Sequence, residues 1–285
     1  MASVIIRLKG GLGNQLFIYS FGLYISRRLQ YKLKIDTISG FVDDRYNRSF
    51  QLEKSGFIKN TEISEFSFSF FNKLERKLQL LLGFRLRNII YINEDDCVVE
   101  KVFNVKKRSP MADIFIEGYF QKSEFVLPIL PILSELYEMN IKSLMLKSRK
   151  SVKNPKVRVA VHIREFQQKD SMLLIEYYKR SVDYLTDQIS GLEFHIFSEH
   201  VLNDNIKNIF LNHNHIFHEV NENDFFKIGC FDHIITANST FSWWIAALSY
   251  YKKGIIIMPD SIHNLTAGNW NSQNLLLPGC DVINV

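Results

Sequence analysis

The chain has 285 residues, of which 46% are hydrophobic and 23% are charged, and its formal net charge at pH 7 is +5. This composition predicts a folded globular protein of one or two domains and excludes a low-complexity disordered chain. The charge is only mildly basic, and Lys and Arg are dispersed along the chain, so we expect no nucleic-acid partner.

The chain opens with the pattern of a strand, a glycine-rich loop and a helix. Residues 4–8 form a short β-branched run, and residues 15–28 carry apolar side chains at helical spacing. The loop glycines Gly10, Gly11 and Gly13 let a ligand approach the backbone, and the helix N-terminus after them favours an anion. This loop matches neither the dinucleotide fingerprint nor a Walker A loop, and by itself it is equally consistent with a tight turn.

The remainder of the first half mixes irregular and helical patterns. From the residue types we expect an irregular segment at 36–56, an amphipathic helix at 71–82, a strand into a turn at 114–120, and helix on both sides of Pro128 and Pro131 over 123–147. The polar stretch 147–155 has the composition of a linker. We therefore predict two domains, residues 1–150 and residues 151–285.

The second half alternates regularly between strands and helices, which indicates a parallel sheet covered by helices. The predicted strands are 157–162, 193–197, 215–218, 232–237 and 254–258, with helices at 176–189, 200–211, 222–229 and 240–252. In such sheets ligands bind beyond the carboxyl ends of the strands.

Polar residues gather at three of these strand ends. One strand ends in His162-Ile-Arg164, another is followed by Ser198-Glu199, and a third by Asn238-Ser239-Thr240. Arg suits a diphosphate because it is always charged and binds it in a bidentate way. A helix that begins in Ser/Thr offers N–H groups to a phosphate. Each feature also has a structural alternative, namely an Arg in an ion pair and an ordinary capped helix whose Trp243 and Trp244 lie in the core.

Four stretches together resemble the α-1,2-fucosyltransferases of glycosyltransferase family 11. The first is GGLGNQLF from Gly10 to Phe17, and the others are VHIR ending at Arg164, FSE ending at Glu199, and ANSTFSWW ending at Trp244. The resemblance implies a GT-B-like α/β fold with two Rossmann-like domains facing across a cleft, an N-terminal acceptor-side domain and a C-terminal GDP-sugar-binding domain. It implies inverting transfer of L-fucose from GDP-fucose to the 2-hydroxyl of a terminal galactoside on a surface glycan such as O-antigen. It implies no metal and no cofactor besides the donor substrate.

Roles for individual residues follow from the resemblance. Arg164 matches an essential arginine expected on the donor diphosphate, and His162 matches the histidine of the same motif. The resemblance therefore implies that both are catalytic residues. The donor is further expected to meet a larger set of residues from both domains. These are Gly11, Gly13, Asn14, Ser198, Glu199, Asn238, Ser239, Thr240 and Ser242.

The chain departs from the family motif directly after Arg164. Glu165 stands where the family has a second arginine, and Gln167 stands where it has an aspartate. Glu165 and Asp170 are the carboxylates that we consider as catalytic bases for the acceptor hydroxyl. The alternatives are a fucosyltransferase of another linkage such as α-1,6, another GDP-sugar enzyme, and a catalytically dead GDP-sugar-binding protein.

The sequence also bears on location. The three cysteines are widely spaced, no signal peptide is evident, and no uncharged apolar run reaches 18 residues. These features predict a cytoplasmic protein without a transmembrane helix. The amphipathic pattern at 71–82 fits packing on the core, on a partner or peripherally on the inner face of a membrane.

Overall fold

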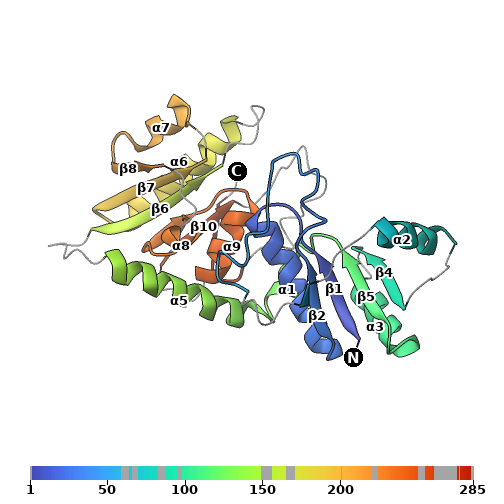
Figure 1. Ribbon diagram of the computed structural model, residues 1–285. Coiled ribbons are helices and arrows are strands. Elements are labelled where there is room, and N and C mark those ends of the chain that lie inside the picture. The colour runs from blue at the N-terminus through green and yellow to red at the C-terminus, as the bar shows by residue number, and fades with distance from the viewer. Residues whose placement is uncertain are drawn as a thin grey trace. The chain divides into compact units, whose positions relative to one another are not determined.

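In the computed structural model the chain forms two compact units, Met1–Ile132 and Leu133–Val285, and each is described by itself (Figure 1). The structure describes residues 2–58, 64–65, 70–82, 88–95, 98–148, 156–164, 171–199, 201–219, 224–249, 254–259, 275 and 277–283.

The first unit is built on a five-stranded sheet whose strands all pair in parallel, in the order β3-β2-β1-β5-β4. Its elements in chain order are β1 (Ser3–Arg7), α1 (Leu12–Leu29), β2 (Lys32–Asp36), β3 (Ser64–Glu65), α2 (Phe70–Leu82), β4 (Ile89–Asn93), α3 (Val98–Arg108), β5 (Asp113–Glu117) and α4 (Ser123–Val126). The apolar strand β1 lies at the centre of this sheet, between β2 and β5.

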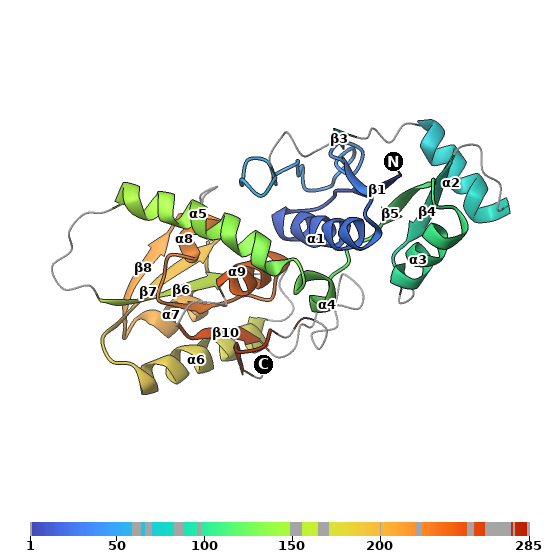
Figure 2. The same ribbon diagram turned by 90° about the horizontal axis from the view of Figure 1, so that it is seen from below.

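Helix α1 lies unusually close to this sheet. A side chain at Gly22 would come within 2.8 Å of Ile6 on β1 and within 3.0 Å of Leu33 on β2, so a glycine is what allows the close approach. Figures 1 and 2 show α1 and α3 side by side along the strands. Because α1 follows β1 directly, its N-terminus and the glycine loop lie at the carboxyl end of β1.

The second unit contains a six-stranded parallel sheet in the order β11-β10-β9-β6-β7-β8. Its elements are α5 (Leu130–Ser148), β6 (Val157–Ile163), α6 (Ser171–Gln188), β7 (Leu192–Ser198), α7 (Asp204–Phe210), β8 (Asn214–His218), α8 (Asp224–Ile228), β9 (His233–Ile235), α9 (Thr240–Ser249), β10 (Ile256–Pro259) and β11 (Asp281–Ile283). Figure 2 shows α6 on one side of the sheet and α5 and α8 on the other. The predicted alternation of strands and helices is thereby confirmed.

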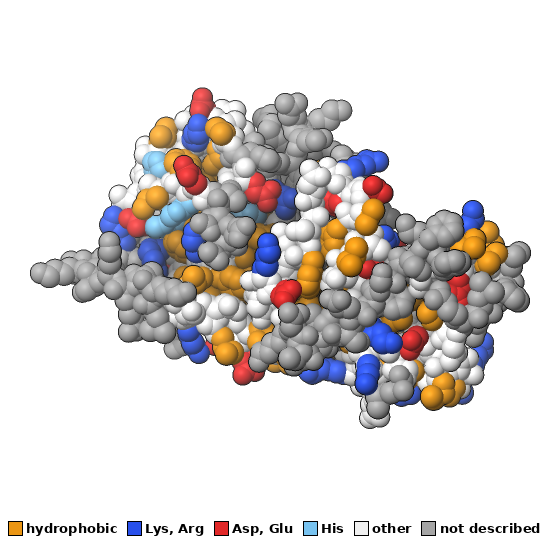
Figure 3. All heavy atoms as spheres, viewed as in Figure 1, with side chains coloured by type: hydrophobic (Ala, Val, Ile, Leu, Met, Phe, Trp, Pro, Cys, Tyr) orange, Lys and Arg blue, Asp and Glu red, His pale blue; other side chains and the backbone are white. Residues whose placement is uncertain are grey.

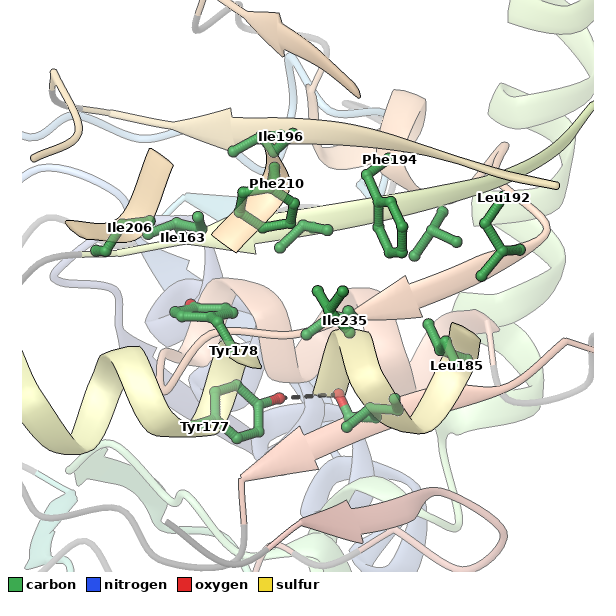
Figure 4. Packing of buried hydrophobic residues seen from close by; sticks show 14 of the residues in the cluster. Ile163, Tyr177, Tyr178, Leu185, Leu192, Phe194, Ile196, Ile206, Phe210 and Ile235 are labelled. Atoms are coloured by element: carbon green, nitrogen blue, oxygen red, sulfur yellow. Dashed lines mark hydrogen bonds between the residues drawn. The ribbon is translucent and has the colours of Figure 1, made fainter. Parts of the chain in front are cut away.

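The core of the second unit fills the space between this sheet and α6 and α7 (Figure 4). Two adjacent tyrosines of α6 are fully buried there, and the hydroxyl of each donates a hydrogen bond to a backbone carbonyl at the end of a strand. Tyr177 donates to the carbonyl of Thr236 at 2.8 Å, and Tyr178 donates to the carbonyl of His162 at 2.8 Å. Buried hydroxyls need such partners, and here they attach α6 to the carboxyl ends of β9 and β6.

The division between the units falls at Ile132/Leu133, earlier than the boundary at residue 150 that the polar stretch predicts. The difference arises because α5 packs within the second unit. Tyr137 is fully buried, donates to the carbonyl of Phe225 at 2.8 Å, and lies with its ring 5.5 Å and 5.4 Å from the rings of Phe225 and Phe226. Of the predicted linker 147–155, residues 147 and 148 belong to α5, and residues 149–155 lie outside the described residues.

The surface gives two observations on partners. On the face shown in Figure 3, Lys and Arg side chains are scattered over the described surface rather than gathered in one patch. Among the helices of the described residues, none combines the length and the hydropathy that crossing a membrane requires.

Candidate functional site

The first turn of α9 lies at the carboxyl edge of the sheet in the second unit. Ser239 caps the helix, since its hydroxyl accepts the N–H of Ser242 at 3.1 Å and its carbonyl accepts the N–H of Trp243 at 2.9 Å. Within the described part of the chain, the N–H groups of Thr240 and Phe241 have no acceptor. The helix therefore presents two backbone donors and the positive end of its dipole at the strand ends.

A direct side-chain bond joins this helix to β6. The imidazole Nδ1 of His162 lies 2.5 Å from the hydroxyl of Ser242, and the same hydroxyl accepts the N–H of Ala237 at 3.0 Å. Burial, assisted by the charge of Arg164, lowers the pKa of His162 to about 3, so the ring is neutral near pH 7. In this geometry His162 fixes the end of β6 against the start of α9, while its assignment as a catalytic residue stays a prediction.

Arg164 follows His162 by two residues and extends the same strand end. Its guanidinium lies 4.0 Å from the carboxylate of Glu199, with side-chain exposures of 21% and 46%. A partly exposed pair at this distance contributes little to stability. An anionic ligand can therefore replace Glu199 beside Arg164 at small cost.

The sheet register brings the three predicted polar clusters to one edge. Strand β6 lies between β7 and β9, with Ile163 opposite Ser198 and Val161 opposite Ile235. Arg164, Ser198 with Glu199, and Asn238 to Ser242 thus occur at neighbouring strand ends, as the sequence predicts. Glu165 and Asp170, the two predicted bases, lie outside the described residues.

The two interpretations of the α9 segment, a helix start that binds a phosphate and a capped helix with tryptophans in the core, are compatible. Trp243 and Trp244 are buried core residues, and the indole N–H of Trp243 donates to the carbonyl of Leu275 at 2.6 Å. Because these rings anchor the helix from its second turn onward, its first turn is held in a fixed position at the strand ends. A rigid helix start is what preorganised binding of an anion requires.

The glycine loop in the first unit is held by side chains that follow it. Gly10 adopts φ +75°, and Gly11 precedes the first residue of α1. The side-chain oxygen of Asn14 accepts a hydrogen bond from Gln121 at 2.9 Å. Gln15 is completely buried and donates to the carbonyls of Gly10 and Ser49 at 2.8 Å and 2.9 Å. The family-like Gln15 is thus a structural residue that shapes the loop, and Gly13 is buried in the first turn of α1.

Sequence reasoning missed a charged cluster at the carboxyl ends of β1 and β5. Glu117 at the end of β5 pairs with Arg7 at 2.8 Å, with Lys9 at 3.8 Å, and with Arg76 of α2. The signal for it was present, because Arg7 and Lys9 flank the end of the first strand and Glu117 ends another. What the sequence lacks is the strand order that makes β1 and β5 neighbours.

The chemistry of the edge in the second unit suits a diphosphate. One guanidinium, two backbone N–H groups and neighbouring hydroxyls stand at the ends of three adjacent strands, and such groups stabilise negative charge. Among the residues that the structure describes, no three His, Cys, Asp or Glu side chains are grouped to hold a metal ion.

Comparison with known proteins adds independent findings. The model of the family described as glycosyl transferase family 11 matches residues 83–274. An α-1,2-colitosyltransferase of Escherichia coli is 28% identical over 280 residues, covering 91% of this chain and 92% of that protein. Among solved structures, NodZ α-1,6-fucosyltransferase soaked with GDP-fucose is similar with a TM-score of 0.51 at 12% identity, covering 87% of this chain and 92% of that one. This likeness confirms the predicted GT-B-like fold with two Rossmann-like domains.

Proposed function

Since the chain belongs to glycosyl transferase family 11 and is a glycosyltransferase, we propose that it transfers L-fucose from GDP-fucose to the 2-hydroxyl of a terminal galactoside. The observation that carries the linkage is the near full-length match to an α-1,2-glycosyltransferase. We further propose that the anomeric carbon is inverted and that the acceptor belongs to a surface glycan.

On the donor side, the proposal rests on the edge built by β6, β7 and α9. Arg164 and the N–H groups of Thr240 and Phe241 stabilise the charge that develops on the departing GDP. Neutral, buried His162 keeps β6 and α9 in register through Ser242. The nucleoside lies near Ser198 and Glu199, and no metal ion or further cofactor takes part.

A second candidate concerns the sugar rather than the reaction. The whole-length relative is described as a colitosyltransferase, and colitose differs from fucose by lacking the 3-hydroxyl. A donor site that hydrogen-bonds this hydroxyl strongly prefers the sugar that carries it, because its absence leaves polar groups unpaired. Competition between the two GDP-sugars therefore decides which one is the donor.

The experiment is incubation of the protein with GDP-fucose or GDP-colitose and a panel of galactosides, with mass detection of products and NMR assignment of the linkage. An α-1,2 product from GDP-fucose supports the proposal. A 1,6-linked product assigns the other linkage, and a colitosyl product assigns the second candidate. Tight GDP-fucose binding without any transfer indicates a GDP-sugar-binding protein.

We also propose that the enzyme works in the cytoplasm and contacts the inner face of the membrane through α2. Leu74 and Leu81 of this helix are 44% and 70% exposed and lie seven residues apart, so they share one face. Flotation with phosphatidylethanolamine–phosphatidylglycerol vesicles tests this, with Leu81→Ser as the variant. Equal flotation of wild type and variant, or none by wild type, excludes the contact.

A further inference from the structure

The loop after β5, Gly118–Gln121, which we call the strap, is fixed by hydrogen bonds to its backbone and by ring stacking. The carboxylate of Glu94 accepts the N–H groups of Tyr119 at 2.6 Å and of Phe120 at 2.8 Å. Phe120 adopts φ +52°, an uncommon value for a side chain of this size, and its ring stacks on Phe21 at 4.0 Å. Strained, well-anchored backbone of this kind is found preferentially at functional sites.

The strap presents an aromatic ring at the carboxyl edge of the sheet. Tyr119 is 39% exposed although its backbone is fixed, and the ammonium group of Lys9 lies 4.4 Å from its ring centre. Lys9 also lies 3.8 Å from Glu117. Burial is the main cause of a lowered pKa of Lys9, with neighbouring charges acting in both directions. A half-buried ammonium between a ring and a carboxylate retains hydrogen-bond capacity for a ligand.

A second tyrosine with a cation above it lies in the loop after β2. The guanidinium of Arg48 is 4.4 Å from the ring centre of Tyr46, which is 72% exposed. The carboxylate of Asp44 accepts the N–H groups of Tyr46 and Arg48 at 2.9 Å and 3.3 Å and so fixes this turn. Arg48 also lies 3.9 Å from where a side chain of Gly11 would begin.

The two pairs belong to one surface. Arg48 borders the glycine loop at Gly11, and Lys9, at the start of that loop, lies over the ring of Tyr119. Gln121 joins the strap to Asn14 of the glycine loop. The loops after β1, β2 and β5 therefore meet where ligands of parallel sheets bind.

We propose that Tyr119 and Lys9, with Tyr46 and Arg48 beside them, form the acceptor-sugar subsite of this enzyme. A pyranose has an apolar C–H face and a rim of hydroxyls, so its face packs on the Tyr119 ring and its hydroxyls meet the two cations. The carboxylates of Glu117, Glu94 and Asp44 offset most of the positive charge of Arg7, Lys9, Arg76 and Arg48. The small net charge that is left suits a neutral sugar. This inference rests on the proposed function, because it names the residues that bind its acceptor.

The test compares Tyr119→Ala, Tyr119→Phe and Lys9→Met in the full chain. A matched control is Tyr31→Ala, because Tyr31 precedes β2 at the opposite edge of the same sheet and also has a lysine, Lys106, over its ring at 5.7 Å. We expect Tyr119→Ala to raise the acceptor KM at least about tenfold, since a lost stacking platform and its buried area together account for that factor. Tyr119→Phe and Tyr31→Ala should stay within about twofold, and the donor KM should be unchanged throughout.

A binding measurement separates this inference from the proposed function. Saturation-transfer NMR with methyl β-D-galactopyranoside and GDP should show transfer from the wild type and from Tyr31→Ala, but not from Tyr119→Ala. Equal signals from Tyr119→Ala and wild type, or no signal from wild type with any methyl pyranoside of a panel, overturn the subsite. Failure of the wild type to transfer fucose overturns the proposed function instead, whatever the NMR result.

Discussion

Replacement of Arg164 by alanine should lower kcat/KM strongly and change the free energy of unfolding little. Its guanidinium lies 4.0 Å from the carboxylate of Glu199, and both side chains are partly exposed. Loss of such a pair costs at most about 1 kcal/mol of folding free energy. Loss of a charge-assisted contact to a diphosphate costs about 2–5 kcal/mol. At about 1.4 kcal/mol per factor of ten, kcat/KM should therefore fall roughly 30- to 4000-fold while the fold survives.

The assay is kcat/KM for fucosyl transfer, with circular dichroism and urea unfolding on the same samples. Arg164→Lys should recover little activity, because an ammonium group cannot reproduce bidentate geometry. Arg158→Ala is the matched control, since Arg158 lies on the same strand β6 and its guanidinium contacts the ring of Phe231 at 5.1 Å instead. The control should lose stability and keep its activity.

The reasoning fails if folded Arg164→Ala retains more than about a tenth of wild-type kcat/KM. It fails equally if Arg158→Ala loses as much activity as Arg164→Ala, because the effect would then report strand β6 as a whole.

Four other changes give contrasting outcomes. Gly11→Ala fits sterically, because the new methyl group would lie 3.9 Å from the nearest atom. The free energy of unfolding should therefore be unchanged while the donor KM rises several-fold, and a destabilised variant contradicts this expectation. Gly229→Ala places a methyl group 2.2 Å from the Tyr137 hydroxyl and should cost about 1–3 kcal/mol, with partial rescue by Tyr137→Phe in urea titrations. His162 stays neutral in the folded protein down to about pH 3, whereas an unfolded histidine binds a proton below about pH 6.5. The contribution of His162 to folding stability is therefore full above pH 6.5 and should fall by about 1.4 kcal/mol per pH unit below it. His162→Asn should remove this slope, and plots of unfolding free energy against pH that run parallel for the variant and the wild type contradict the prediction. EDTA should leave transfer intact, and an absolute need for Mn²⁺ or Mg²⁺ would refute the metal-free site. GDP at 100 times its Kd should stabilise the fold by about 2.7 kcal/mol, measured in thermal melts.

The second sheet could be predicted from the sequence because its strands are short apolar runs separated by helical patterns. The first sheet was harder, and β2 was not predicted. Helix α1 ends at Leu29, and the capping residue Gln30 adopts a left-handed conformation in place of the glycine that normally marks such an end. Strand β2 begins only two residues later, and its alternation of Lys and apolar residues is too short to identify by itself.

The same contrast holds for the site. Arg164 and Ser239 are local signals, a strand end and a helix cap, and a single sequence carries them. The bond between His162 and Ser242, the contact of Asn14 with Gln121, and the pair of Arg7 with Glu117 each join residues 80 or more positions apart. Such pairings depend on strand order, which local residue patterns do not determine.

The central place of β1 also has a consequence for synthesis of the chain on the ribosome. One edge of β1 pairs with β2, which emerges soon afterwards, but the other edge waits for β5 at residues 113–117. At about 5–20 residues per second, this apolar strand spends several seconds with one edge unpaired. The nascent first unit is thus exposed to edge-to-edge association until β5 is made, and expression at lower temperature or with a chaperone that covers strand edges should raise the soluble yield.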